Sequence, residues 1–127
     1  MHNIQSPRTD DGAIELEIQA KGLTAARVTP ADIEDNIASE HYFTAGDGLF
    51  GAEVQACGTP VTNLQALNLL TFCVLVLRNG FTVTGESACA SPENFDVEIG
   101  RKIARQNAIN KVWPLMGYAL RSKLSGA

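Results

Sequence analysis

The chain has 127 residues, of which 45% are apolar, so it is long enough for one hydrophobic core and too short for two independent domains. Its formal net charge of −4 argues against binding to DNA, because a protein that tracks a DNA backbone needs a broadly basic surface. No apolar run approaches the ~20 residues that span a membrane. The N-terminal segment MHNIQSPRTDDG lacks the basic start and the apolar centre of a secretory signal, so we expect a cytosolic protein.

Charge is divided unevenly along the chain. Residues 1–98 contain 14 acidic and 4 basic side chains, whereas residues 99–127 contain 6 basic side chains and no acidic one. This separation favours either a local pocket for an anion or a charge-complementary second protomer.

The cysteines and histidines predict neither disulfides nor a metal site. Cys57, Cys73 and Cys89 form no CxxC pair, and their odd number and wide spacing argue against both. We expect Cys73 and Cys89 to be reduced thiols buried in a sheet. The two histidines are isolated in the sequence, so no metal and no cofactor are expected.

The polar residues 1–12 are expected to form a flexible leader, and residues 13–127 a single α+β domain. In the segment AIELEIQAKG, the apolar residues Ile14, Leu16 and Ile18 alternate with polar ones. This period of two predicts a half-buried edge strand.

The next segment, TPADIEDNIASEHYF, predicts the N-terminal helix. Thr29 is the expected N-cap, Pro30 takes the first helical position, and acidic residues follow in the first turn. The helix is expected to end before the glycines of TAGDG. Residues 44–66 contain scattered glycines and are expected to form a mobile loop with some strand character.

A hairpin centred on Asn79-Gly80 is the clearest local signal, because this dipeptide separates LNLLTFCVLVLR from FTVTGESACA. Asn-Gly between two β-rich runs favours a two-residue type I′ turn, in which both central residues need a positive φ. Such a turn sets Leu77 opposite Thr82. The first strand is apolar on both faces and needs cover on both sides, which indicates a homo-oligomer built from dimers.

The basic C-terminal segment predicts a helix that opens at ASPENFDVEIG with Ser91 as its N-cap. Gly100, Ala104 and Ala108 lie four residues apart and predict a seam where this helix approaches another element closely. Pro114 is expected to kink or break the helix. The predicted fold is therefore α+β: an antiparallel sheet with a central Asn-Gly hairpin, packed against a kinked C-terminal helix and a shorter N-terminal helix.

The order of these elements, and above all the motifs NGFTVTGESAC, NFD, IGRKIA and NKVWPLMGY, resembles the small tailed-phage and prophage family named after phage gene products 49 and 66, over residues 29–124. The resemblance implies a phage or prophage product in the cytoplasm of a bacterial host. An antiparallel sheet followed by C-terminal helices is also similar to the Thoeris anti-defence sponges. Those proteins bind cyclic ADP-ribose-type signals and related cyclic oligonucleotides without cleaving them, so the similarity implies the same activity here.

A nucleotide sponge needs cationic donors for phosphates, a flat ring for the base and amides for the edge of the base. Residues of all three kinds gather in or near the basic segment. The expected ligand-binding residues are Arg78, Phe81, Asn94, Phe95, Arg101, Arg105, Lys111, Trp113 and Arg121. Core packing is the alternative for Phe95 and Trp113, and ion pairs with the acidic N-terminal helix are the alternative for the basic residues.

Catalysis is not expected, because the sequence contains no Gly-rich phosphate loop, nucleophile elbow or HExxH motif. The alternative function is a host-takeover interaction module whose basic C-terminal helix docks on an acidic bacterial protein. A sponge needs a concave pocket that encloses most of its ligand, whereas a docking module needs a larger and flatter face.

Overall fold

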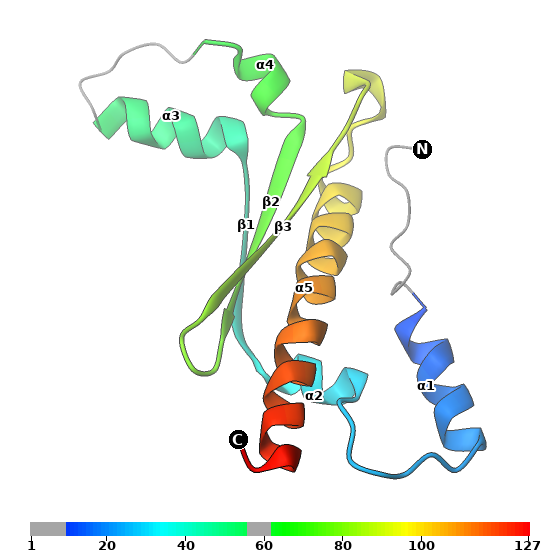
Figure 1. Ribbon diagram of the computed structural model, residues 1–127. Helices are drawn as coiled ribbons and strands as arrows, with labels where there is room; N and C mark the ends of the chain where they lie inside the picture. The colour runs from blue at the N-terminus through cyan, green and yellow to red at the C-terminus, as the bar shows by residue number, and fades with distance from the viewer. Residues whose placement is uncertain (1–9, 56–61) are drawn as a thin grey trace.

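The protein folds into a three-stranded antiparallel sheet with one long helix across one of its faces (Figure 1). The computed structural model describes residues 10–55 and 62–127. In chain order the elements are α1 (Asp11–Ala20), α2 (Pro30–Asp35), β1 (Ile37–Thr44), α3 (Ala45–Gln55), α4 (Leu64–Leu67), β2 (Leu70–Leu77), β3 (Thr82–Ala88), the 3-10 helix η1 (Pro92–Asn94) and α5 (Val97–Ser125). The predicted α+β class is confirmed. None of the described helices has both the length and the apolar composition needed to cross a membrane.

The central strand of the sheet is β2, which lies between β1 and β3. Its side chains alternate between a buried face, which includes Cys73 and Leu75, and a half-buried face, which includes Phe72 and Val74. Helix α5 packs over the buried face (Figure 1). The strand is therefore apolar on both faces, as predicted, and its second face is only partly covered by the described residues.

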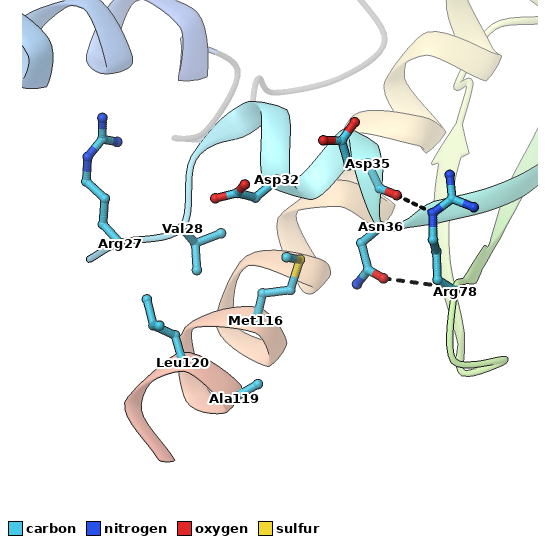
Figure 2. A pocket seen from close by; sticks show the side chains of 9 residues that line it. All are labelled: Arg27, Val28, Asp32, Asp35, Asn36, Arg78, Met116, Ala119 and Leu120. Atoms are coloured by element: carbon cyan, nitrogen blue, oxygen red, sulfur yellow. Dashed lines mark hydrogen bonds between the residues drawn. The ribbon is translucent and has the colours of Figure 1, made fainter. Parts of the chain in front are cut away.

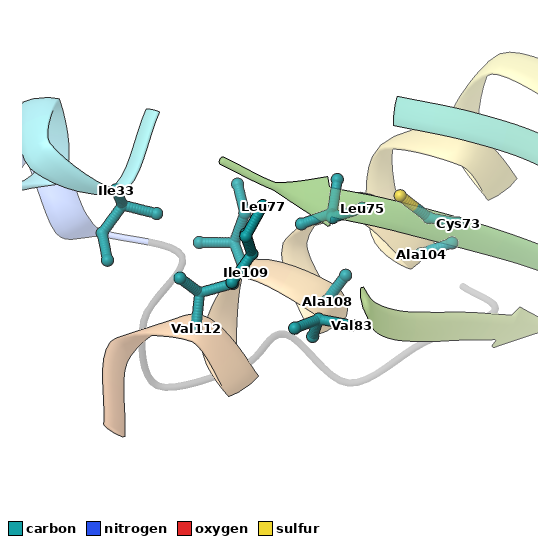
Figure 3. Close-up of a cluster of buried hydrophobic side chains, with 9 residues drawn as sticks. All are labelled: Ile33, Cys73, Leu75, Leu77, Val83, Ala104, Ala108, Ile109 and Val112. Carbon is teal, nitrogen blue, oxygen red and sulfur yellow. The ribbon is translucent and has the colours of Figure 1, made fainter. Parts of the chain in front are cut away.

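The hydrophobic core lies between the sheet, α2 and α5 (Figure 3). Leucines of β2 meet Ile109 and Val112 of α5, and Ile33 of α2 closes one end. The buried members are Ile33, Cys73, Leu75, Leu77, Val83, Ala104, Ala108, Ile109 and Val112. Cys89 is also buried, so the predicted burial of both described cysteines is confirmed, while Cys57 lies outside the described residues.

Small residues allow α5 to approach the sheet closely. Gly100, Ala104 and Ala108 are all buried, and the predicted seam is confirmed. Gly85 of β3 lies directly under it, since a Cβ added there would be 2.2 Å from the carbonyl oxygen of Ala104 and 2.3 Å from the amide nitrogen of Ala108. The strand and the helix therefore meet backbone to backbone.

The predicted hairpin is confirmed, but its turn has three residues instead of two. Leu77 N–H donates to the carbonyl of Phe81 at 2.8 Å, and Gly80 N–H donates to the carbonyl of Leu77 at 2.9 Å. Gly80 has a φ of +88°, whereas Asn79 has no positive φ, so the predicted type I′ turn is wrong. A glycine with positive φ at the end of a three-residue loop is the next most common hairpin connection.

The longer turn shifts the strand register by one residue from the predicted pairing. Thr82 pairs with Val76, not with Leu77, and Val83 pairs with Leu75. This register puts Val83 on the buried face beside Leu75 and Leu77, while Thr82 stays exposed. The predicted register would have buried threonines of β3 against α5. The observed register is favoured over it because it buries Val83 together with the leucines of β2.

The segment predicted as an edge strand is helix α1. Gln19 donates to Glu15 at 2.8 Å, and Lys21 lies 3.1 Å from Glu17, so side chains four residues apart stabilise the helix. No residue of α1 is buried, and the helix lies away from the sheet (Figure 1). The strand prediction, which was based on the alternation of apolar and polar residues, was wrong. Glu, Gln, Leu and Ala are good helix formers, and the segment pairs with no described strand. Most of the predicted leader lies outside the described residues.

The predicted N-terminal helix begins correctly but ends early. Asp32 N–H donates to Thr29 Oγ1 at 3.1 Å and Thr29 N–H to Asp32 Oδ2 at 2.9 Å, which confirms the predicted N-cap as part of a capping box. The helix stops at Asp35, and residues 37–44 form β1 instead of its C-terminal part. β-Branched and aromatic residues favour this strand, which completes the hydrogen bonds of β2 on one side.

Residues 44–66, predicted to form a loop, contain helices α3 and α4. Thr44 and Asp47 form a second capping box at the start of α3. Residues 56–61 lie outside the described part of the chain. The glycines suggested a turn, but Gly46 and Gly48 lie within the first turn of α3, where the capping box compensates for their low helix propensity.

Helix α5 starts later than predicted and does not break. Ser91 precedes η1, and the N-cap of α5 is Asp96, whose carboxylate accepts a backbone N–H three residues ahead at 2.9 Å. A kink or a break was expected at Pro114, and the helix continues through this residue, so the break does not occur. A proline inside a helix costs about 3 kcal/mol, but Val112 and Met116 on either side both pack on the core and hold the two halves together.

Candidate functional site

A cavity of about 390 Å³ lies where β1 leads into α3, beside the first turns of α5. It brings together Phe95 and Arg101 from the predicted set of ligand-binding residues. The cavity is lined by Phe43, Thr44, Asp47, Asn68, Thr71, Phe95, Val97 and Arg101. Its volume falls at the lower end of the ~300–1,000 Å³ typical of small-molecule sites.

The capping box of α3 fixes one wall of the cavity. Thr44 N–H donates to Asp47 Oδ2 at 3.1 Å, and Asp47 N–H donates to Thr44 Oγ1 at 3.0 Å. The Thr44 hydroxyl also lies 3.4 Å from Asn68 Oδ1. These contacts hold the end of β1, the start of α3 and the residues before β2 in one arrangement, with the Asp47 carboxylate anchored on the wall.

Arg101 of α5 supplies the cationic side chain that lines the cavity. The guanidinium carbon of Arg101 lies 5.6 Å from the centre of the Tyr42 ring, within the range of a cation–π contact. Arg101 is exposed and forms no ion pair with any described residue. Phe95 is half-buried beside it. The guanidinium is therefore positioned by an aromatic ring while its N–H donors remain available to an anion.

The floor of the cavity contains a buried hydroxyl. Thr71 of β2 is 3% exposed, and its Oγ1 has no hydrogen-bond partner among the described residues. Gly100 of α5 packs against it.

Arg105 does not reach the cavity but holds α2, β1 and α5 together. Its Nη2 and Nη1 donate to the two carboxylate oxygens of Glu34 at 2.7 and 3.1 Å, and its Nε donates to Glu40 at 3.1 Å. Burial alone would raise the pKa of Glu40, but hydrogen bonds from Tyr42 and Arg105 outweigh it, so the pKa is lowered. Burial and the Glu40 carboxylate raise the pKa of Tyr42. The alternative considered from sequence, an ion pair with the acidic N-terminal helix, is correct for Arg105.

Lys111 and Trp113 also have partners outside the cavity. Lys111 Nζ lies 3.9 Å from Glu86 of β3. Trp113 packs against the core and donates from Nε1 to Asp11 of α1 at 3.1 Å. Trp113 therefore packs on the core, which was the alternative to ligand binding, and does not line the cavity.

Arg78 and Phe81 lie around the β2–β3 turn. This turn is at the opposite end of the strands from α3 and α4 (Figure 1). Arg78 Nε donates to the carbonyl of Asp35. Phe81 lines a separate hollow of about 290 Å³, and Asn94 and Arg121 are exposed and line none of these hollows. The hollow at Arg78, of about 500 Å³, is more open and is lined by Arg27, Val28, Asp32, Asp35, Asn36, Arg78, Met116, Ala119 and Leu120 (Figure 2).

Most residues that line the cavity were not among the predicted ligand-binding residues. Thr44 and Asp47 were placed in a loop, although the TAGD segment carries the same Thr-x-x-Asp pattern as TPAD at the start of α2. Thr71 was assigned to the correct strand, but only the packing of α5 buries its hydroxyl beside a cavity. No group of three or more His, Cys, Asp or Glu side chains within residues 10–55 and 62–127 is arranged to hold a metal ion.

Comparisons with known proteins agree with the sequence motifs. Residues 28–124 match the family described as phage protein (N4 Gp49/phage Sf6 gene 66). These bounds lie within one residue of those expected from the motifs. No curated protein and no solved structure matches the chain.

Proposed function

The chain belongs to the phage protein (N4 Gp49/phage Sf6 gene 66) family, and we propose that it sequesters a small cyclic nucleotide signal without cleaving it. Such a protein would act in the bacterial cytoplasm against a defence system that uses a cyclic ADP-ribose-type or cyclic oligonucleotide signal. The observation that carries the proposal is the cavity that joins the available guanidinium of Arg101 to the ring of Phe95.

The opposite charges of Arg101 and Asp47 in the cavity favour one orientation of the ligand. Arg101 is suited to a phosphate, because guanidinium donors form strong charge-assisted hydrogen bonds with phosphate oxygens. Asp47, which also lines the cavity, repels phosphate and is suited to accept hydrogen bonds from sugar hydroxyls or base N–H groups. The rings of Phe43 and Phe95 offer flat surfaces for a base. The small volume suits one nucleotide unit, so the rest of a cyclic ligand would extend beyond the cavity.

The alternative function, docking of the basic helix on an acidic host protein, has less support. A docking helix needs a continuous basic face, but Arg105 and Lys111 in the middle of α5 already face acids of α2, β1 and β3. The basic residues that form no ion pair with described residues lie toward the two ends. Arg101 and Arg121 are separated by roughly 30 Å along the axis at ~1.5 Å per residue. A compact anionic ligand fits this distribution better than an extended acidic surface.

Calorimetry with cyclic ADP-ribose isomers and cyclic di- and trinucleotides tests the proposal. Arg101→Ala should weaken binding by roughly ten- to a hundredfold, because a charge-assisted hydrogen bond contributes ~1.5–3 kcal/mol. Arg121→Ala is the matched control, since it removes the same charge from an exposed position of the same helix outside the cavity. The control variant should bind as wild type does.

Mass spectrometry of ligand released by denaturing the complex separates a sponge from a hydrolase. The sponge should return the ligand unmodified. If no nucleotide binds the wild-type protein more tightly than ~100 μM, the sequestering function is rejected and docking on a host protein becomes the better hypothesis.

A further inference from the structure

We infer that Thr71, with Gly100 packed beside it, forms a polar recess in the cavity that selects ligands with a hydrogen-bonding edge at that point, such as a nucleobase. This inference rests on the proposed function, because it assigns a selective role within the same cavity. Thr71 would bind the base of the ligand, whereas Arg101 would bind its anionic group.

The first observation is the state of the Thr71 hydroxyl. The residue is 3% exposed, lines the cavity, and has no hydrogen-bond partner for Oγ1 among the described residues. Buried polar atoms are nearly always hydrogen-bonded, so a buried hydroxyl at a cavity wall without a partner indicates a group that binds there. A hydroxyl can both donate and accept, and it therefore matches either an amide or a ring nitrogen.

The second observation is that Gly100 keeps the space beside this hydroxyl open. A Cβ added to Gly100 would lie 3.0 Å from Thr71 Oγ1 and 4.0 Å from Cε1 of the Phe95 ring. A methyl group would therefore occupy the gap between the hydroxyl and the ring. Glycine is a poor helix former, and its place at the end of the first turn of α5 is explained by this close approach.

Together these residues define the chemical class of the ligand. A planar heterocycle stacked on Phe95 would point one edge at Thr71, while its phosphate extends toward Arg101 on the same wall. A flat anion without a polar edge would leave the hydroxyl unpaired. A site built around a hydrogen-bonding group discriminates strongly against analogues that lack it.

The test uses Thr71→Val, which removes the hydroxyl with almost no change of shape, and Thr71→Ser, which keeps it. With the cyclic ADP-ribose isomer or cyclic oligonucleotide that wild type binds best, Thr71→Val should weaken binding about tenfold or more. Thr71→Ser should stay within about threefold of wild type. Ribose 5-phosphate, which has the anion but no base, should lose no affinity in Thr71→Val.

Melting temperatures of the unliganded variants give an independent readout. Thr71→Val should melt at or above the wild-type temperature, because an unpaired buried hydroxyl is removed. A clear drop would mean that the hydroxyl is already paired inside the protein, and the recess would be refuted even if wild type bound no nucleotide at all. If Arg101→Ala weakens nucleotide binding and Thr71→Val does not, the recess is refuted while the proposed function stands.

Discussion

Replacement of Gly85 by alanine should destabilise the protein strongly, because β3 and α5 meet there backbone to backbone. The added Cβ would lie 2.2 Å from the carbonyl oxygen of Ala104 and 2.3 Å from the amide nitrogen of Ala108. Neither neighbour is a side-chain end that can rotate away. Ordinary van der Waals contact begins at 3.4 Å, so helix α5 must move away from the sheet by about 1.2 Å or more before the added carbon no longer clashes with the Ala104 oxygen.

A movement of this size weakens the contacts of Ile109 and Val112 with the sheet. A gap of ~0.5–1 Å removes a quarter to a half of the dispersion attraction between the atoms that face it. Overpacked cores typically lose ~1–3 kcal/mol, and we expect about 3 kcal/mol here because both obstacles are backbone atoms. That is a large part of the ~5–15 kcal/mol by which a domain is usually stable.

Urea unfolding followed by circular dichroism measures the free energy of unfolding of this variant. Gly117→Ala is the matched control, since it adds the same methyl group to α5 at a position with no heavy atom within 4 Å. The control should be more stable than wild type by ~0.5–1 kcal/mol, because alanine is the better helix former. An unchanged urea midpoint for Gly85→Ala would refute the close packing of β3 on α5.

Three further predictions concern other parts of the chain. Hydrogen bonds from Arg27 lower the pKa of Glu15 to about 2, so their stabilising effect is complete above the ordinary value of 4.5 and is lost as the pH falls toward 2. An NMR titration should find that low midpoint in wild type and a return toward 4.5 in Arg27→Ala. Pro114→Ala should raise the free energy of unfolding by up to ~3 kcal/mol, because the helix regains a backbone hydrogen bond; a lower melting temperature would contradict this. The half-buried apolar face of β2 should pack on a second copy, so sedimentation at micromolar concentration should show a dimer that Val74→Glu weakens, and a monomeric wild type would contradict the prediction.

The sequence by itself determined the features that depend on neighbouring residues or on a regular pattern. The N-cap at Thr29 is a contact over three residues, and the small-residue seam of α5 repeats every four, so both are visible in the printed order. The two strands around Asn79-Gly80 follow from their composition and the turn between them. The α+β class follows from these elements together.

The tertiary structure decided the features in which different arrangements are locally equivalent. Two- and three-residue turns both suit Asn-Gly, and the choice was made by the need to bury Val83 against α5. Residues 13–20 suit a strand or a helix, and the absence of a described strand beside them leaves the helix.

Long-range contacts also decided which basic side chain remains available to a ligand. Arg101 and Arg105 are equivalent in sequence, four residues apart on one helix. Glu34, which is 71 residues away from Arg105, takes the guanidinium of that arginine and not of Arg101. Charge composition fixes how many ion pairs are possible, but only the packing of α2 and β1 against α5 determines which side chains come within hydrogen-bonding distance.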